Sequence, residues 1–190
     1  MIALSSIPVF HVPGQMDSGE LLTRSTVWMA LSCYVASELS MAIRPGRERA
    51  SVSWLLNAAG CVFFFAHVVF AFHYYYHWSH AAAYAETARQ SKEMTGWDSG
   101  DGLYVNYIFA IVWICEVVWA RIAPIRYSSR TKIWSWTIRA FFLFMIFNGA
   151  FIFVRSEYRW LGLMLCFLLL LSWGLRIKRR VDWGAISKSS

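Results

Sequence analysis

The sequence has few charged residues: Asp, Glu, Lys and Arg make up 15% of its 190 residues, whereas soluble domains usually carry about 25%. Proline is also scarce, at 4 residues, and none of the 4 cysteines forms a C-x-x-C pair. These deficits exclude collagen-like, disordered and disulfide-stapled proteins. Hydrophobic residues reach 58%, with 14 Phe and 11 Trp. They occur in blocks long enough to cross a bilayer, so the sequence predicts a small multi-pass membrane protein.

The apolar blocks predict an all-α fold, an integral membrane bundle of five transmembrane helices. A bilayer core of about 30 Å requires about 20 helical residues. The five predicted spans are residues 25–43, 52–73, 103–120, 134–154 and 158–175. An outer helical segment over 78–101 and a basic tail over 176–190 complete this single membrane domain.

The distribution of Lys and Arg predicts the orientation, because loops rich in these residues stay cytoplasmic. Assigning successive loops to alternate sides, and counting Arg139 with the loop before it, puts 13 of the 18 basic residues on one side and 5 on the other. We therefore expect the N-terminus outside and the C-terminus in the cytoplasm, in the plasma (inner) membrane. A basic run beside a span is typical of contact with membrane lipids, and we do not expect nucleic acid as a partner.

Three histidines lie at the outer end of the second span and just beyond it, with the spacing H-x3-H-x2-H. On a continuous helix His73, His77 and His80 would lie within a sector of about 60°, whereas His67 points elsewhere and lies deeper. Imidazole binds zinc, copper and iron, and helical His pairs hold one ion well. The spacing therefore indicates a transition-metal site at the outer membrane edge. Its candidate additional ligands are Glu86, Asp98, Asp101 and His11.

A second interpretation of these histidines stays open. Tyr74, Tyr75, Tyr76 and Trp78 lie between them, and aromatic residues concentrate at the membrane interface. The histidines would then be hydrated members of that aromatic belt. The chain that carries these histidines either extends the second span outward as a helix, or bends near Trp78 and lies along the membrane surface.

Other cofactors fit the sequence less well. Haem between helices usually takes histidines from two spans, and here only the second span contains any. Membrane di-iron enzymes need about eight histidines in several boxes, in contrast to five in this chain. No Lys lies within a span, which excludes a retinal Schiff base. No nucleophile elbow, H-E-x-x-H helix or phosphate loop is present.

Charged residues inside spans form a second candidate site. Glu38, Glu116 and Arg139 lie in the first, third and fourth spans, where charges are costly and usually paired or functional. At 1.5 Å per residue, all three reach the inner half of the membrane, together with Asn57. We expect either a structural Glu–Arg–Glu cluster or a proton relay.

Two segments carry a resemblance to known proteins: residues 77–90 (HWSHAAAYAETARQ) and residues 102–107 (GLYVNY). The region 67–121 that contains them resembles a family of uncharacterised small bacterial multi-pass membrane proteins. The resemblance implies a bacterial membrane location and draws attention to residues 77–107. It implies no activity and no catalytic residue.

Three functions follow from these features. The first is a metal-binding membrane protein that uses His73, His77 and His80. The second is a non-catalytic membrane subunit or scaffold, in a homo-oligomer or a larger complex. The third is a small proton-coupled transporter that uses Glu38 and Glu116.

Overall fold

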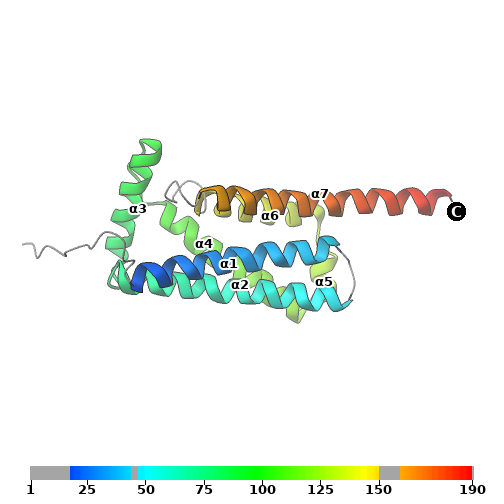
Figure 1. The fold of residues 1–190 in the computed structure, drawn as a ribbon, viewed down its shortest axis with the longest axis horizontal. Coiled ribbons are helices and arrows are strands. Elements are labelled where there is room, and N and C mark those ends of the chain that lie inside the picture. Colours follow the sequence, from blue (N-terminus) through cyan, green and yellow to red (C-terminus); the bar gives the residue numbers. More distant parts are fainter. Residues whose placement is uncertain (1–17, 44–46, 150–158, 190) are drawn as a thin grey trace, which may run out of the picture.

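The computed structural model describes residues 18–43, 47–149 and 159–189, and within these ranges the regular structure is entirely helical (Figure 1). This confirms the predicted all-α class. The described helices are α1 (Ser18–Ile43), α2 (Arg47–Tyr74), α3 (His80–Thr95), α4 (Gly102–Ile122), α5 (Pro124–Ser128), α6 (Lys132–Phe147) and α7 (Arg159–Ser189).

Four of the described helices are long and apolar enough to cross a membrane. They are α1, α2 from Ala50, α4, and α7 as far as Arg179. The remaining predicted span, 134–154, corresponds to α6, which has 16 residues. The end of that prediction, 150–154, lies outside the described residues. A helical membrane bundle is therefore supported, and the number of five spans stays a prediction.

The long helices alternate in direction (Figure 1). Helices α1, α4 and α7 run one way, and α2 and α6 run the other way, as expected if each helix crosses the membrane in turn. Helix α3 lies across one end of the bundle, called here the α3 end, and α5 lies at the opposite α5 end. Helix α7 continues well past the α5 end, so the segment that we predicted as a basic tail is largely helical.

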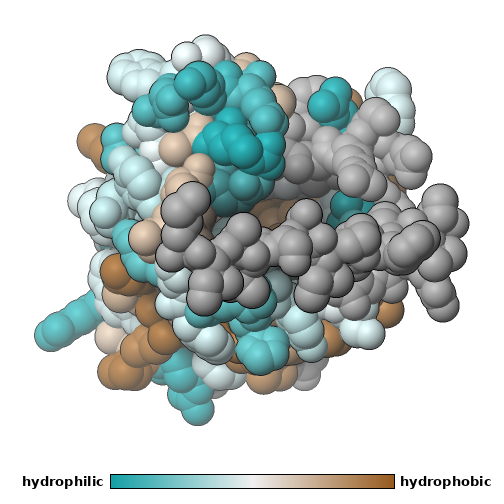
Figure 2. Space-filling view, turned by 90° about the vertical axis from the view of Figure 1, so that its left-hand side faces the viewer, coloured by the Kyte–Doolittle hydropathy of each residue, from teal (hydrophilic) through white to brown (hydrophobic). Residues whose placement is uncertain are grey.

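Helix α3 is set off from α2 by a turn. Ser79 caps its first turn by accepting a hydrogen bond from the Ala82 amide at 3.2 Å, and Gly96 ends it with φ +78°. The helix is shorter than the predicted outer segment 78–101. Its charged residues give the α3 end a hydrophilic region, whereas hydrophobic side chains lie on the flanks of the bundle (Figure 2).

Aromatic rings form the centre of the bundle around Trp113 of α4, which is 1% exposed. Tyr34, Phe64, Phe109 and Phe142 all have ring centroids within 5.3–5.7 Å of its ring. The Trp113 indole N–H donates to Asn57 Oδ1 at 2.9 Å, so its one polar atom is satisfied. Helices α1, α2, α4 and α6 thus share one core.

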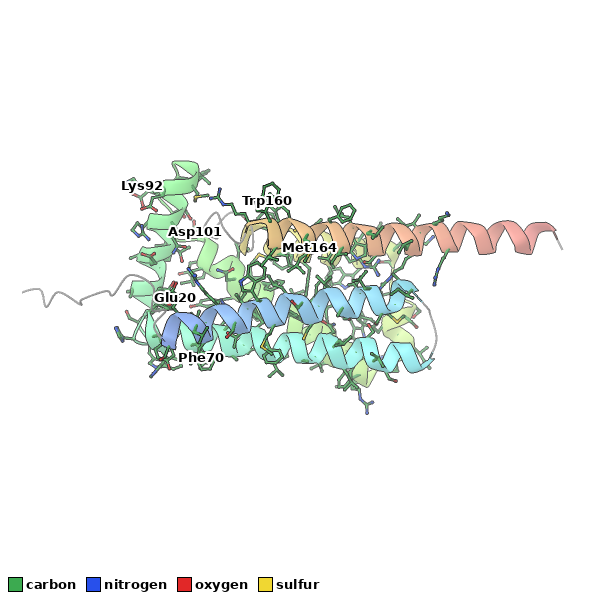
Figure 3. All side chains as sticks on the ribbon, viewed as in Figure 1. Glu20, Phe70, Lys92, Asp101, Trp160 and Met164 are labelled. Atoms are coloured by element: carbon green, nitrogen blue, oxygen red, sulfur yellow. The ribbon has the colours of Figure 1, made fainter. Side chains whose placement is uncertain are left out.

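The side chains at the α3 end are more polar and more exposed than this core (Figure 3). Asp101 and Lys92 belong to α3 and its connection to α4, and Lys92 lies beyond the bundle on the far part of α3. Trp160 begins α7 at the same end and is largely exposed. Exposed aromatic rings at this level are typical of the membrane interface.

Candidate functional site: two carboxylates held by arginines

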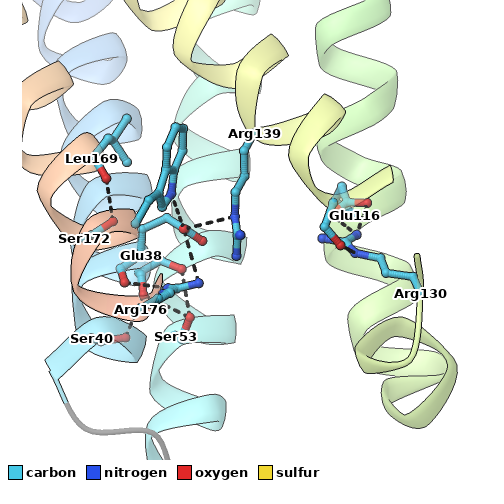
Figure 4. Close-up of polar contacts among 12 residues, drawn as sticks. Glu38, Ser40, Ser53, Glu116, Arg130, Arg139, Leu169, Ser172 and Arg176 are labelled. Atoms are coloured by element: carbon cyan, nitrogen blue, oxygen red, sulfur yellow. Dashed lines mark hydrogen bonds and ion pairs between the residues drawn. The ribbon is translucent and has the colours of Figure 1, made fainter. Parts of the chain in front are cut away.

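The first carboxylate, Glu38, is partly buried and joins α1, α6 and α7 (Figure 4). Its Oε2 accepts a hydrogen bond from the Trp173 indole N–H at 2.8 Å. The same oxygen lies 3.4 Å from Arg176 Nη1 and 3.7 Å from Arg139 Nε. Arg176 also donates through Nη2 to the backbone carbonyl of Glu38 at 2.6 Å. We call Glu38, Arg139, Trp173 and Arg176 the Glu38 cluster.

Aromatic rings support this cluster from the side. Arg139 lies over the Trp136 ring, with its Cζ 5.5 Å from the ring centroid. The Trp136 ring in turn meets the Trp173 ring edge-on at 5.9 Å. A guanidinium stacked on an indole retains a favourable electrostatic contact away from water. Arg139 is therefore held by Glu38 on one side and by the Trp136 ring on another.

The second carboxylate, Glu116, is buried and has a different partner. Arg130 Nη1 donates to both of its oxygens at 2.6 Å, and the Tyr127 hydroxyl donates to Oε2 at 2.9 Å. The side chains of Arg130 and Glu116 are 11% and 8% exposed. Arg130 also lies over the Tyr127 ring at 4.1 Å. These three residues form the Glu116 cluster.

The Glu116 cluster depends on the short helix α5. Pro124 occupies the first turn of α5, where its missing N–H has no cost and its fixed φ favours helix. This single turn reverses the chain after α4, so Tyr127 and Arg130 return to the carboxylate. Arg130 Nε then donates to Ser135 Oγ at 3.0 Å in the first turn of α6. One arginine thus links α4 to the start of α6.

The electrostatics of this cluster keep its donors protonated. Burial, followed by the negative charge of Glu116, raises the pKa of the Tyr127 hydroxyl. Burial alone would lower the pKa of Arg130, but the hydrogen bond and charge of Glu116 outweigh it, so the pKa of Arg130 is raised. Tyr127 and Arg130 therefore act as permanent donors to the carboxylate.

The structure divides the polar residues expected to meet inside the membrane. It brings Glu38 to Arg139, as one part of the expected cluster, and it places Glu116 in a cluster of its own (Figure 4). The Asn57 side chain instead accepts a hydrogen bond from the Trp113 indole. The expected Glu–Arg–Glu arrangement is therefore replaced by two separate clusters, because Arg130 is much closer to Glu116.

Sequence reasoning missed four members of these clusters: Tyr127, Arg130, Trp173 and Arg176. It counted Arg130 with a cytoplasmic loop and Arg176 with the tail. The spacing of Trp173 and Arg176 offered one signal, because residues three apart share a face of a helix. The sequence gives no comparable signal for Arg130, whose position depends on the reversal at α5.

The three histidines of the predicted metal site do not share one helical stripe. Helix α2 ends at Tyr74 and α3 begins at His80, and both His77 and Trp78 between them have positive φ, 46° and 62°. Such φ values are uncommon for residues other than glycine. They turn the chain out of the α2 axis, so the alternative of a bend near Trp78 is confirmed and the continuous helix is wrong.

The imidazoles contact aromatic rings. His73 lies 4.8 Å from the Tyr74 ring, and His80 lies 5.9 Å from the rings of both Tyr104 and Tyr107. His67, deeper in α2, has Nδ1 2.8 Å from the Thr23 carbonyl. Since a carbonyl only accepts, that nitrogen carries the proton.

The candidate acidic ligands have other partners. Glu86 accepts hydrogen bonds from Arg89 and Gln90, Asp98 pairs with Lys92 at 2.7 Å, and Asp101 accepts from Tyr84 at 3.4 Å. Within the described residues, no group of three or more His, Cys, Asp or Glu side chains is placed to hold one metal ion. His11 lies outside those residues. Binding of zinc, copper or iron thus stays a prediction, without the helical stripe that suggested it.

No protein-family model matches this chain, and no curated protein or solved structure is similar to it. The resemblance of region 67–121 to small bacterial membrane proteins therefore stays a prediction. The candidate site has to be interpreted from its own chemistry, which consists of two carboxylates, three arginines and their aromatic neighbours.

Proposed function

We propose that this chain is a non-catalytic membrane subunit, which packs through its apolar surface into a larger assembly of the bacterial plasma membrane. The observation that carries the proposal is that both carboxylates, the buried Glu116 and the partly buried Glu38, already have arginine partners from other parts of the chain. Charges arranged in this way join helices, and they supply the fixed frame that a scaffold requires.

The alternative, a proton-coupled transporter, requires Glu38 or Glu116 to gain and lose a proton. Protonating Glu116 would leave the Arg130 guanidinium, which is 11% exposed, without a counter-charge. An uncompensated buried charge is strongly unfavourable. The same step at Glu38 would leave two arginines with one neutral partner. The geometry therefore favours a structural role for both carboxylates.

The apolar surface supports the choice of a subunit. Large apolar side chains are exposed on several helices, such as Val62 of α2, Ile111 of α4 and Trp160 of α7. Such a surface has no polar groups to bind a water-soluble substrate. It is suited to lipid and to other membrane helices.

A paired set of variants separates the two functions. Glu116→Gln and Arg130→Gln should each reduce the yield of folded protein, whereas the double variant should recover much of it because no charge stays buried alone. Arg126→Gln, which changes an exposed arginine of α5, is the control. Normal folding of Glu116→Gln together with loss of pH-dependent flux in proteoliposomes would establish the transporter instead.

The assembly itself is tested by purification from native membranes in mild detergent. The 22.0 kDa chain should elute in a larger particle that contains a second integral membrane protein at a fixed ratio, measured by native mass spectrometry. Elution as the isolated chain from several mild detergents would contradict the proposal.

A further inference from the structure

An apolar groove of about 530 Å³ lies between α6 and α7. Ala140, Phe144 and Phe147 line it on α6, and Leu163, Phe167 and Leu170 line it on α7. The two helices are antiparallel, so Ala140 and Leu170 mark one end of the groove, and Phe147 and Leu163 mark the other. The lining residues extend over seven residue steps on each helix, so the groove is about 10 Å long. Phe144 and Phe167 are 55% and 64% exposed, so the groove opens on the side of the bundle.

The Ala140–Leu170 end of the groove points toward the α5 end of the bundle, where basic side chains continue both helices. Lys132 begins α6 and Lys178 extends α7; both are exposed. Each is eight residues beyond the groove, which is about 12 Å along its helix. Lys178 also lies about 60° from the centre of the groove-lining face of α7, at 100° per residue. One cation on each helix thus stands beyond the same end of the groove.

Among the described side chains around the Ala140–Leu170 end of the groove, basic residues outnumber acidic ones. Lys132, Arg139, Arg176, Lys178 and Arg179 are basic, and Glu38 is the acidic residue that Arg139 and Arg176 share. Trp136, which pairs with Trp173, lies between the groove and Lys132. Tryptophan is enriched at the level of lipid headgroups. This end of the molecule therefore combines an apolar groove, tryptophan rings of the kind found at the level of lipid headgroups, and an excess of positive charge.

We infer that this site binds one anionic glycerophospholipid, with an acyl chain in the α6–α7 groove and the phosphate between Lys132 and Lys178. Basic pockets between membrane helices are suited to anionic headgroups. A membrane helix of a partner or a second copy is a poorer occupant, because it would need contact over about 30 Å rather than about 10 Å. The inference does not depend on the proposed function.

Native mass spectrometry of the full-length chain in detergent tests this inference, with phosphatidylglycerol and phosphatidylcholine of identical acyl chains as probes. We expect phosphatidylglycerol to bind at least fivefold more tightly. The Lys132→Gln/Lys178→Gln variant should reduce its affinity to that of phosphatidylcholine. Ala140→Phe, which fills one end of the groove, should weaken the binding of both lipids at least fivefold.

Two control variants match these changes. Arg121→Gln/Arg126→Gln removes two exposed charges at the same end of the bundle, and Val62→Phe adds the same ring at a position of α2 that is 67% exposed. Both should bind phosphatidylglycerol like the unchanged protein. If Ala140→Phe is not helical and monodisperse, Ala140→Leu replaces it.

Several results would overturn the inference. Equal affinity for the two lipids would show that the lysines do not recognise the anionic headgroup. A loss of affinity in the charge control as large as that in the Lys132→Gln/Lys178→Gln variant would show general attraction to the basic surface. Unchanged binding by the folded Ala140 variant would exclude the groove. Full competition by glycerol phosphate would show a phosphate site that does not use the acyl chain.

Discussion

At the scale of single residues, the Glu38 cluster is asymmetric, with two arginines for one carboxylate. Glu38→Gln leaves the partly exposed Arg139 and Arg176 without a counter-charge, and we expect it to lower the free energy of unfolding by about 1.5–3 kcal/mol. Arg139→Gln leaves Glu38 with Arg176 and Trp173, and should cost only about 1 kcal/mol. Thermal unfolding in detergent measures both changes.

The control for this comparison is Glu20→Gln, which removes an ion pair with Arg24 at 2.9 Å on the surface of α1. Partly exposed pairs of this kind contribute about 0.3–0.5 kcal/mol. A cost for Arg139→Gln as large as that for Glu38→Gln would contradict the assigned charge balance.

Gly60 of α2 provides a second prediction for a single residue. A Cβ atom at Gly60 would lie 3.0 Å from the Ala30 carbonyl oxygen and 3.1 Å from the Trp113 ring. Gly60→Leu should therefore push α1 and α4 away from α2 and destabilise the protein by about 1–3 kcal/mol. Gly174→Leu is the matched helical control, because nothing lies within 4 Å of its added Cβ. Equal melting temperatures for the two variants would show that α1 and α2 are not packed closely at Gly60.

At the scale of the helices, α3 should respond to pH through Glu86. The hydrogen bond from Arg89 lowers the pKa of the Glu86 carboxyl below its ordinary value. A lowered pKa stabilises the folded helix above the unfolded value of about 4.3, and this contribution is lost as the pH falls through the folded pKa. Hydrogen-exchange protection of α3 amides, corrected for intrinsic rates, should therefore decrease between about pH 5 and pH 3.

Glu86→Gln should remove most of this pH dependence, because glutamine does not titrate. Asp98→Asn serves as the comparison, since it removes the other nearby carboxylate that pairs with α3. Retention of the full decrease in Glu86→Gln would assign the effect to another group.

The helices differ in how far the sequence predicts them. Apolar length located α1, α2, α4 and α7, since their composition alone meets the requirement of a bilayer. The break between α2 and α3 was harder to predict, because the segment from His73 to His80 contains no Gly or Pro. Its turn relies on left-handed backbone at His77 and Trp78. Similarly, α5 is too short to carry a periodic pattern, so its effect on Arg130 could not be foreseen.

At the scale of the whole molecule, the two charged clusters lie toward the α5 end, to which most basic residues of the chain are also assigned (Figures 1 and 4). Arg130 pairs with the buried Glu116, and Arg139 and Arg176 pair with the partly buried Glu38, which removes part of that charge from solvent. Lys132 at the start of α6 and Lys178 and Arg179 of α7 remain exposed. These side chains still favour the cytoplasmic leaflet, which is rich in anionic lipid.

This asymmetry predicts that the α5 end faces the cytoplasm. In a variant whose native cysteines are replaced, Ser99→Cys, next to α3, should react with a membrane-impermeant maleimide in intact cells. Ser129→Cys, which follows α5, should react only after the membrane is permeabilised. Both positions lie outside the helices that could cross the membrane, so unequal labelling reports the side rather than burial in lipid. If Ser129→Cys alone were labelled in intact cells, the α5 end and its positive charge would lie outside, and the predicted orientation would be wrong.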